Sequence, residues 1–162
     1  MGQLNDPVTV ESVSAGVIRP LRHEVLRVGL PEDSVRFRGD DHPLVLHVAA
    51  RFVTNGREAE VVAVGTIFPD APPWEPTRVH AWRIRGMATG ERYRGHGLGR
   101  RVLDALVSHA TDHDGSFVWC HARIGALDFY LHAGFVTIGE LFDDGVAIHQ
   151  SMWRTLELHD EG

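Results

Sequence analysis

The fold is decided by one stretch of the sequence, ERYRGHGLGRRVL at residues 91–103. It places Gly95, Gly97 and Gly99 at alternate positions between a strand-like segment and an amphipathic helix. Only glycine lets a backbone bend tightly and approach a ligand with no side chain in the way. Peptide N–H groups in such a loop can converge on one point, where the start of the helix adds partial positive charge. We therefore predict a loop that binds phosphate or diphosphate, with neighbouring arginines supplying countercharge.

Two common phosphate loops do not match this stretch. A Walker A loop needs a Gly-Lys pair followed by Ser or Thr, and the chain has no Gly-Lys pair. The dinucleotide fingerprint G-x-G-x-x-G would need glycine at position 100 or 102, which hold Arg100 and Val102. That fingerprint also belongs to an early strand of a repeating βαβ unit, whereas this loop lies past the middle of the chain. Both mismatches disfavour a nucleotide-binding module.

Strand-like and helix-like segments alternate along the rest of the chain. Apolar residues recur at helical spacing over 17–28, where Pro20 requires a place in the first turn, and again from Leu98 to Ala110. A further helix is predicted at 125–133. Strands are predicted at 7–13, 44–53, 60–68, 79–89, 117–121, 135–141 and 146–156, with turns at Asn55-Gly56 and at 143–145 and loops at 29–42 and 70–76. This order predicts a mixed α/β sheet with helices on both faces.

Composition is typical of a globular enzyme: 162 residues predict one domain, with an acidic tail from about residue 157. No stretch approaches the length of a membrane span, and no secretory signal is recognisable, so we expect no membrane association. The net charge of −6 disfavours a nucleic-acid partner and is compatible with a cationic amine substrate. A single cysteine excludes an internal disulfide and favours a cytoplasmic location.

Two motifs carry a resemblance to a known family. The segment RGHGLG at residues 94–99 matches an Arg/Gln-x-x-Gly-x-Gly/Ala pattern, and ALDFYLHAGF at 126–135 matches an Ala-x-x-Phe-Tyr helix that closes on Gly-Phe. In this order and spacing they resemble the GNAT superfamily of N-acetyltransferases. The resemblance spans about residues 79–153, and Gly145, His149 and Met152 resemble the terminal hairpin of a bacterial branch. It implies a GNAT-like α/β (α+β) fold with a mixed, mostly antiparallel central sheet flanked by helices on both faces.

The resemblance also implies an activity, which is direct transfer of an acetyl group from acetyl-coenzyme A (acetyl-CoA) to an amine of a small molecule or peptide. No acyl-enzyme forms in this superfamily, and positioning of the two substrates supplies much of the rate. Because edge strands of the predicted sheet are exposed, we expect that the protein can form a homodimer. The cofactor would be bound by strand backbone and by the loop, with His96 contributing its N–H; the residues concerned are Met87, Ala88, Thr89, Arg94, Gly95, His96, Gly97, Leu98, Gly99 and Arg100.

Candidate catalytic residues follow from the same resemblance. Tyr130 aligns with the superfamily tyrosine that donates a proton to the departing thiolate, as a phenol within reach can do; a packed core tyrosine is the alternative. His149, on a predicted strand, is the candidate base, with a structural histidine as its alternative. No carboxylate occurs from Val79 to Thr89, where several members place a base, so a water chain is a further option, with Glu75 and His80 as remote candidates.

The remaining polar residues favour structural roles. His121 and Cys120 end a strand where related sequences often carry asparagine; the lone Cys120 is expected to be buried and inert. The remaining histidines are scattered along the chain and are expected on solvated faces, so no metal site is predicted. Asp40 and Asp41 are expected in an exposed turn, although they could attract an amine. The alternative function is an acyl-CoA-binding sensor or interaction module that has lost turnover.

Overall fold

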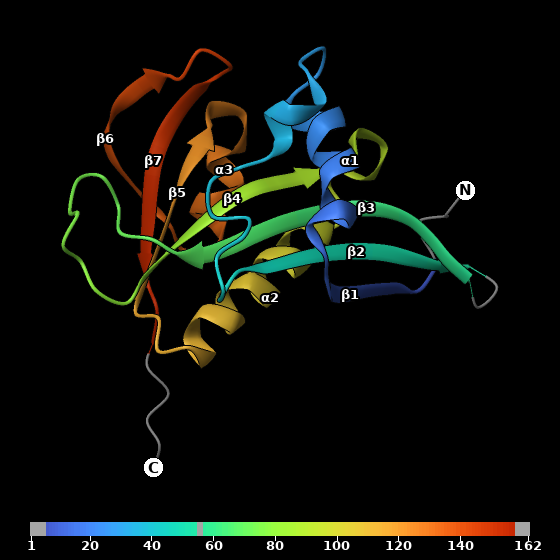
Figure 1. The fold of residues 1–162 in the computed structure, drawn as a ribbon, viewed down its shortest axis with the longest axis horizontal. Coiled ribbons are helices and arrows are strands. Elements are labelled where there is room, and N and C mark those ends of the chain that lie inside the picture. Colours follow the sequence, from blue (N-terminus) through green and yellow to red (C-terminus); the bar gives the residue numbers. More distant parts are fainter. Residues whose placement is uncertain (1–5, 55–56, 158–162) are drawn as a thin grey trace.

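The structure, a computed structural model, describes residues 6–54 and 57–157. Its strands form a seven-stranded sheet in the order β1-β2-β3-β4-β5-β7-β6. The elements along the chain are β1 (Val8–Val13), α1 (Ala15–Leu26), the 3-10 helix η1 (Glu32–Val35), β2 (Leu46–Thr54), β3 (Arg57–Pro69), β4 (Ala81–Thr89), η2 (Glu91–Tyr93), α2 (Leu98–Asp112), β5 (Phe117–Arg123), η3 (Ile124–Ala126), α3 (Leu127–His132), β6 (Val136–Asp143) and β7 (Ile148–Thr155). The mixed α/β architecture predicted from the sequence is confirmed (Figure 1).

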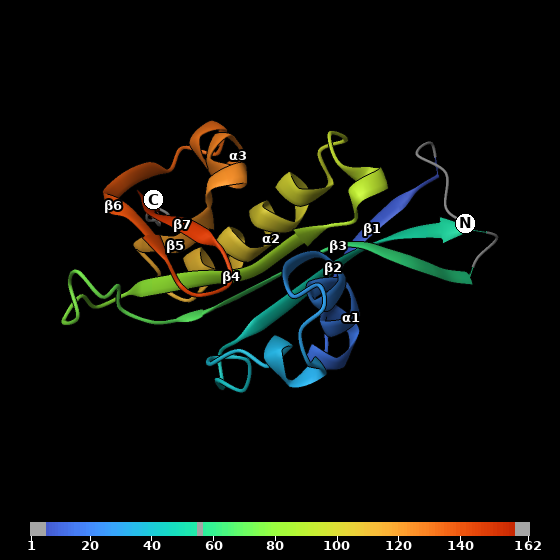
Figure 2. The same cartoon turned by 90° about the horizontal axis from the view of Figure 1, so that it is seen from above.

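Helices cover both faces of the sheet, with α1 on one face and α2 and α3 on the other (Figure 2). Alternation along the strands produces this arrangement, because successive side chains point to opposite faces. Ala49, Val64 and Ala88 form a core with α1, whereas residues of the opposite parity such as Val48 and Ala63 join the larger core under α2. Each face therefore has its own apolar layer, and the sheet separates them.

Neighbouring strands are antiparallel except β4 and β5, which run parallel. This parallel pair is short: it begins at Ala81 opposite Phe117 and ends at Arg83 opposite Trp119. Both strands continue beyond that point, β4 to Thr89 and β5 to Arg123. The two strands therefore diverge within the sheet and leave backbone groups of β4 without a neighbouring strand on that side.

A β-bulge lies in β4 where it diverges from β5. Thr66 pairs with Arg85 and Val64 with Ala88, so Gly86 and Met87 together face Gly65. Gly86 has φ +65°, in the left-handed region that favours glycine. A Cβ on Gly65 would lie 2.4 Å from Met87 Sδ, so a larger residue there would require the Met87 side chain to move. The bulge redirects the last residues of β4 relative to the rest of the strand.

Several predicted boundaries differ from the structure. α1 begins at Ala15 rather than Val17, so Pro20 lies in the second turn and the first-turn expectation is wrong. Ile18 and Leu21 of α1 are buried against the sheet, and burial of each side chain stabilises the fold by about 1.5–3 kcal/mol. This stabilisation offsets the cost of about 3 kcal/mol for a proline inside a helix. The predicted loop at 29–42 contains η1, and the predicted 125–133 helix divides into η3 and α3. Asn55-Gly56 lies outside the described residues.

Candidate active site

A cavity of about 760 Å³ opens where β4 and β5 part. It reaches both faces of the sheet, because its lining includes the start of α2, two residues of α3, and residues at the end of α1. Both predicted catalytic residues and nine of the ten predicted cofactor-binding residues line it: Tyr130, His149, Met87, Ala88, Thr89, Arg94, Gly95, Gly97, Leu98, Gly99 and Arg100. The tenth, His96, lines a separate pocket of about 260 Å³ beside Arg101.

The glycine loop at the start of α2 has the geometry of an anion cradle. Gly95 and Gly97 have φ of +80° and +76°, and a Cβ on either would meet no atom within 4 Å. Within the described chain, the N–H groups of residues 95–100 donate to no backbone carbonyl or side chain, and no side chain caps α2. Unpaired N–H groups at a helix start, together with the helix dipole, bind anions. The residues present therefore fit a diphosphate.

Gly99 brings the helix start close to β4. A Cβ there would lie 3.2 Å from Thr89 Oγ1 and 3.5 Å from a ring carbon of Phe129. Arg94 Nε donates to the Thr89 carbonyl at 3.4 Å, and Arg100 Nε donates to Asp104 at 2.9 Å. Both arginines are exposed at the mouth of the cavity, so most of their donors remain available to a ligand.

Tyr130 lies at the inner end of this cavity, on α3. Its side chain is 5% exposed, and its hydroxyl hydrogen-bonds the thiol of Cys120 on β5. Burial raises the Tyr130 pKa well above its ordinary value, with the Cys120 sulfur adding to the shift, so the phenol stays protonated. Burial also raises the pKa of the Cys120 thiol to about 12. The tyrosine therefore holds a proton beside a sulfur atom, and Cys120 is buried as expected from the sequence.

His149 lies near the start of β7, lines the cavity and is 8% exposed. Its Nδ1 lies 3.0 Å from the Ala147 carbonyl and 3.6 Å from Asp144 Oδ2, and its ring stacks on Phe142. A carbonyl accepts a hydrogen, so Nδ1 carries the proton and Nε2 keeps a lone pair. The pKa of His121, on the neighbouring strand, is lowered to about 4 by burial first and then by Arg83 and His149. The lowered pKa makes His121 a poor candidate for accepting a proton.

A family model described as Acetyltransferase (GNAT) family matches residues 20–135. The chain belongs to this family. A relative from Bacillus subtilis (strain 168), named as the uncharacterized N-acetyltransferase YitI, is 26% identical over 148 residues, covering 91% of this chain and 95% of the relative. The resemblance drawn from the two sequence motifs is thereby confirmed, and acyl transfer is the general chemistry of the family.

Solved structures confirm the GNAT fold. A Lactobacillus plantarum protein matches with a TM-score of 0.74 at 20% identity, covering 94% of this chain and all of that one. The NatC complex bound to Gag peptide and CoA matches with a TM-score of 0.74 at 14% identity, covering 93% of this chain and 99% of that one. GNAT enzymes generally use acetyl-CoA and acetylate amines of small molecules or proteins.

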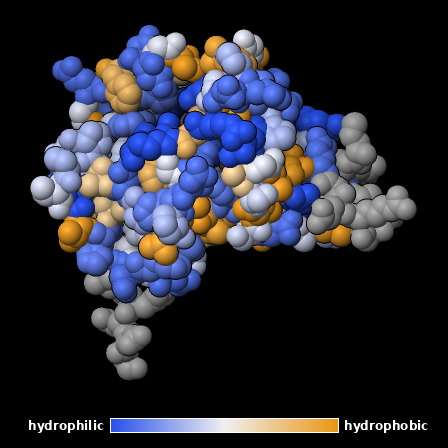
Figure 3. Space-filling model, viewed as in Figure 1, coloured by the Kyte–Doolittle hydropathy of each residue, from blue (hydrophilic) through white to orange (hydrophobic). Residues whose placement is uncertain are grey.

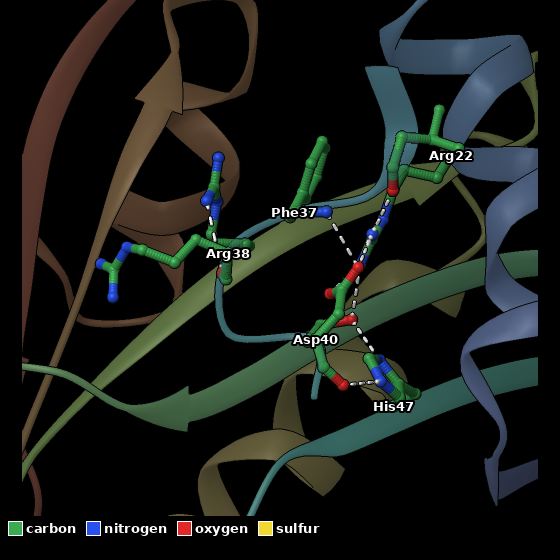
Figure 4. A network of polar contacts seen from close by, with 8 residues as sticks. Arg22, Phe37, Arg38, Asp40 and His47 are labelled. Atoms are coloured by element: carbon green, nitrogen blue, oxygen red, sulfur yellow. Dashed lines mark hydrogen bonds and ion pairs between the residues drawn. The ribbon is translucent and has the colours of Figure 1, made fainter. Parts of the chain in front are cut away.

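Asp40 occupies a different place from the exposed turn expected of it. It is 7% exposed and accepts two hydrogen bonds from the guanidinium of Arg22, at 2.7 and 3.1 Å (Figure 4). The Arg22 guanidinium, with the Phe37 N–H, holds the Asp40 pKa below its ordinary value despite burial. Arg22 also donates to Thr66 Oγ1 at 2.9 Å, and His47 Nδ1 lies 2.8 Å from the same hydroxyl. Asp40 is therefore the centre of a buried polar network and does not face an incoming amine; Asp41 is exposed as expected.

Residues that were not predicted from the sequence also line the cavity between β4 and β5. Four half-buried arginines line it on the α1 side of the sheet: Arg27, Arg83, Arg85 and Arg123. Arg83 and Arg85 alternate with Trp82 and Ile84, which lie in the core on the α2 side. That alternation was visible in the sequence and placed both arginines on one face of the strand. No group of three or more metal-ligating residues occurs in the described chain, and no described helix is long and apolar enough to span a membrane.

Proposed function

We propose that this chain transfers an acetyl group from acetyl-CoA to the amine of a small molecule or peptide. One observation carries the proposal: a single cavity joins the glycine cradle at the start of α2 to the buried hydroxyl of Tyr130, through the gap between β4 and β5. When bound, acetyl-CoA supplies the activated acetyl thioester. The chain's own residues supply binding, orientation and proton transfer.

Binding would use backbone groups at both ends of the gap. The N–H groups of residues 95–100 would hold the diphosphate, assisted by Arg94 and Arg100. The unpaired edge of β4 at Met87, Ala88 and Thr89 offers peptide groups to an extended, amide-containing chain lying beside it. Such a chain would replace the strand that is absent between β4 and β5. Its far end would then lie near Tyr130.

Tyr130 would act as the general acid. The amine nitrogen forms the bond to the acetyl carbon as the carbon–sulfur bond breaks, and the departing sulfur takes the phenolic proton. Burial keeps the phenol protonated, so the proton is in place when negative charge develops on the sulfur next to it. The Tyr130 hydroxyl already lies beside the Cys120 sulfur atom, which supports this role.

His149 would act as the base that receives the proton lost by the amine. Its Nδ1–H is fixed by the Ala147 carbonyl and Asp144, which leaves the Nε2 lone pair free to accept. Asp144 is itself held as a carboxylate, because N–H groups of Ala147 and Val146 lower its pKa against the opposing effect of burial. Stacking on Phe142 restricts the ring, so the imidazole is oriented before the amine arrives.

The test combines binding and turnover in the full chain. Acetyl-CoA should raise the melting temperature, since a ligand that binds the folded state stabilises it. An amine panel scored by release of free CoA thiol should then identify an acceptor. An unchanged melting curve at saturating acetyl-CoA would contradict the proposal. Binding without turnover by any amine would instead favour an acyl-CoA sensor.

A further inference from the structure

The end of the cavity on the α1 side is rich in positive charge. Arg83 and Arg85 come from β4, Arg123 from the end of β5, and Arg27 from the end of α1. These arginines lie on the sheet face opposite α2, because the alternate residues Trp82, Ile84, Cys120 and Ala122 belong to the core under α2. Figure 3 shows this face, where strongly hydrophilic side chains gather across the middle of the molecule. The cluster is therefore separated by the sheet from the glycine cradle.

Most of this charge has no carboxylate partner within the protein. Among the described residues, Arg27, Arg85 and Arg123 form no ion pair, and Arg83 approaches Asp70 Oδ2 only at 3.9 Å. Asp144 is the one carboxylate among the residues lining the cavity in the described chain, and it lies 3.6 Å from His149 Nδ1. Four arginines therefore share this end of the cavity with one carboxylate, and positive charge is in excess.

Existing contacts use few of the guanidinium donors. Arg27 and Arg123 each donate to the Leu26 carbonyl at the end of α1, where the helix dipole favours cations. Arg85 donates to the Arg38 carbonyl at 3.5 Å and lies 4.5 Å from the centre of the Phe37 ring. A guanidinium has five N–H donors, so most remain free in each of the three side chains. The hydrogen bonds to the end of α1 explain in part why Arg27 and Arg123 lie here. They do not explain the position of Arg85.

Holding these arginines together is unfavourable without a counterion. The pKa of Arg85 is lowered by burial first and then by the charges of Arg22 and Arg27. The pKa of Arg83 is lowered to about 10 by burial and by Arg85, and that of Arg123 is lowered by burial and by Arg27. Since an arginine stays protonated in proteins, the cluster remains cationic. The attraction of an anionic ligand group would offset the repulsion among these cations and the cost of their partial burial.

We propose that the acceptor is a small amine that also carries an anionic group, a carboxylate or a phosphate, bound by Arg85 with Arg27 and Arg123. This inference rests on the proposed acetyl transfer and names its substrate class. Arginine forks match the geometry of both anions. The net charge of −6 is compatible with a purely cationic acceptor, but the local charge of the cavity is opposite in sign to that of the whole chain and favours an acceptor with an anionic group.

The same charges orient the acceptor. Asp144 beside His149 attracts the amino group, while the arginines repel it and attract the anion. Neighbouring cations also lower the pKa of a bound amine and so increase its neutral, nucleophilic fraction. The acceptor would therefore bind with its amine toward His149 and its anion toward Arg85.

A matched set of amines tests the proposal in the full chain. β-Alanine, 2-aminoethylphosphonate, β-alaninamide and 1,3-diaminopropane carry their terminal group on the same two-methylene spacer and differ in terminal charge, and longer homologues extend the reach. The rate of CoA release should be higher with the anionic amines than with the neutral and cationic ones. The ratio of the rates with the carboxylate and the phosphonate shows which anion the site prefers. The chain contains no lysine, so acetylation of its own lysine side chains cannot contribute. Equal or faster turnover of the neutral or cationic members would overturn the proposal.

Two variants locate the anion. Arg85→Gln should lower kcat/KM for anionic amines roughly 10- to 100-fold, as loss of a charge-assisted hydrogen bond does, and should lower it much less for neutral amines. Arg36→Gln removes the same charge from an exposed position outside the cavity and should preserve the preference. An equal loss for all amines in Arg85→Gln would show a structural role and contradict the proposal.

A binding measurement separates this inference from the proposed function. At saturating acetyl-CoA, glutarate or inorganic phosphate should raise the melting temperature of the wild type and of Arg36→Gln, but not of Arg85→Gln. If acetyl-CoA raises the melting temperature and neither anion adds to it, the anion site is wrong and the acetyl-CoA site stands. If an Arg85-dependent anion shift occurs with no turnover of any amine, the anion site stands and catalysis is wrong.

Discussion

Arg22 of α1 contacts both Asp40 and the β4 bulge. Its guanidinium donates to the Asp40 carboxylate at 2.7 and 3.1 Å, and its Nε lies 2.7 Å from where a Cβ on Gly86 would stand. Arg22 is fully buried and also donates to the Val35 carbonyl, so α1, the loop after it and the bulge are joined through one side chain. The bulge that separates β4 from β5 is thereby held by a buried ion pair.

Removal of one partner of this pair should be strongly destabilising. Asp40→Ala leaves the Arg22 charge buried without compensation, and we expect the free energy of unfolding to fall by about 3–5 kcal/mol, measured by urea denaturation. Asp41→Ala removes the neighbouring exposed carboxylate and should change the free energy by less than about 0.5 kcal/mol. Similar effects of the two substitutions would contradict the structural role given to Asp40.

Blocking the glycine cradle should prevent cofactor binding. In Gly97→Glu, a carboxylate would occupy the open space that faces the unpaired N–H groups, so acetyl-CoA should no longer raise the melting temperature. The backbone strain of a positive φ is reproduced in Gly29→Glu, because Gly29 has φ +74° and likewise no atom within 4 Å. That control should keep the full acetyl-CoA shift. A retained shift in Gly97→Glu would exclude the loop as the diphosphate site.

The sequence predicted those features that depend on local chemistry. Glycines at positions 95, 97 and 99, followed by a helical apolar pattern, determine a loop and a helix start without reference to distant residues. Fold class and family followed from the two motifs and are confirmed. An isolated glycine in a strand pattern also signals a bulge, so Gly86 carried a signal that was not used.

The features that were missed depend on contacts between distant residues. The 29–42 segment is polar and lacks periodicity, which favours an exposed loop, yet Asp40 is buried because Arg22 reaches it from 18 residues away. The arginine cluster likewise combines α1, β4 and β5, and only the two arginines of β4 share a recognisable local pattern. The roles of Tyr130 and His149 stay predictions.

Loss of the Tyr130 hydroxyl should slow the chemical step. With no proton donor beside the departing sulfur, Tyr130→Phe should lower kcat by about 10²–10⁴-fold and leave the acetyl-CoA melting shift largely intact. Tyr93→Phe is the matched control, since the Tyr93 hydroxyl donates to Glu60 at 2.7 Å rather than to a sulfur atom. Parallel loss of kcat and of acetyl-CoA binding in Tyr130→Phe would indicate a structural role.

Cys120 should be unreactive in the folded chain. A thiol pKa of about 12 makes its thiolate fraction at pH 8 roughly 10³-fold smaller than that of a free cysteine, and the side chain is 2% exposed. A disulfide reagent that reports thiol release should therefore label the one cysteine only after denaturation. Cys120→Ser keeps a hydrogen-bonding partner for Tyr130 and should retain turnover. Rapid labelling of the native chain, or loss of turnover in Cys120→Ser, would support a nucleophilic cysteine instead.

The stability of the chain should depend on pH through His121. Its pKa is about 4 in the folded state, because burial and Arg83 disfavour the cation, whereas an unfolded chain titrates near 6.5. Between these values the unfolded state binds more protons, so the free energy of unfolding should decrease as the pH falls from about 6.5 to about 4. His121→Asn retains a polar group beside Ser151 Oγ, 2.9 Å from Nδ1 in the wild type, and should make this decrease shallower. His132→Asn, at an exposed position on α3, should leave the slope unchanged; identical slopes in wild type and His121→Asn would contradict the assignment.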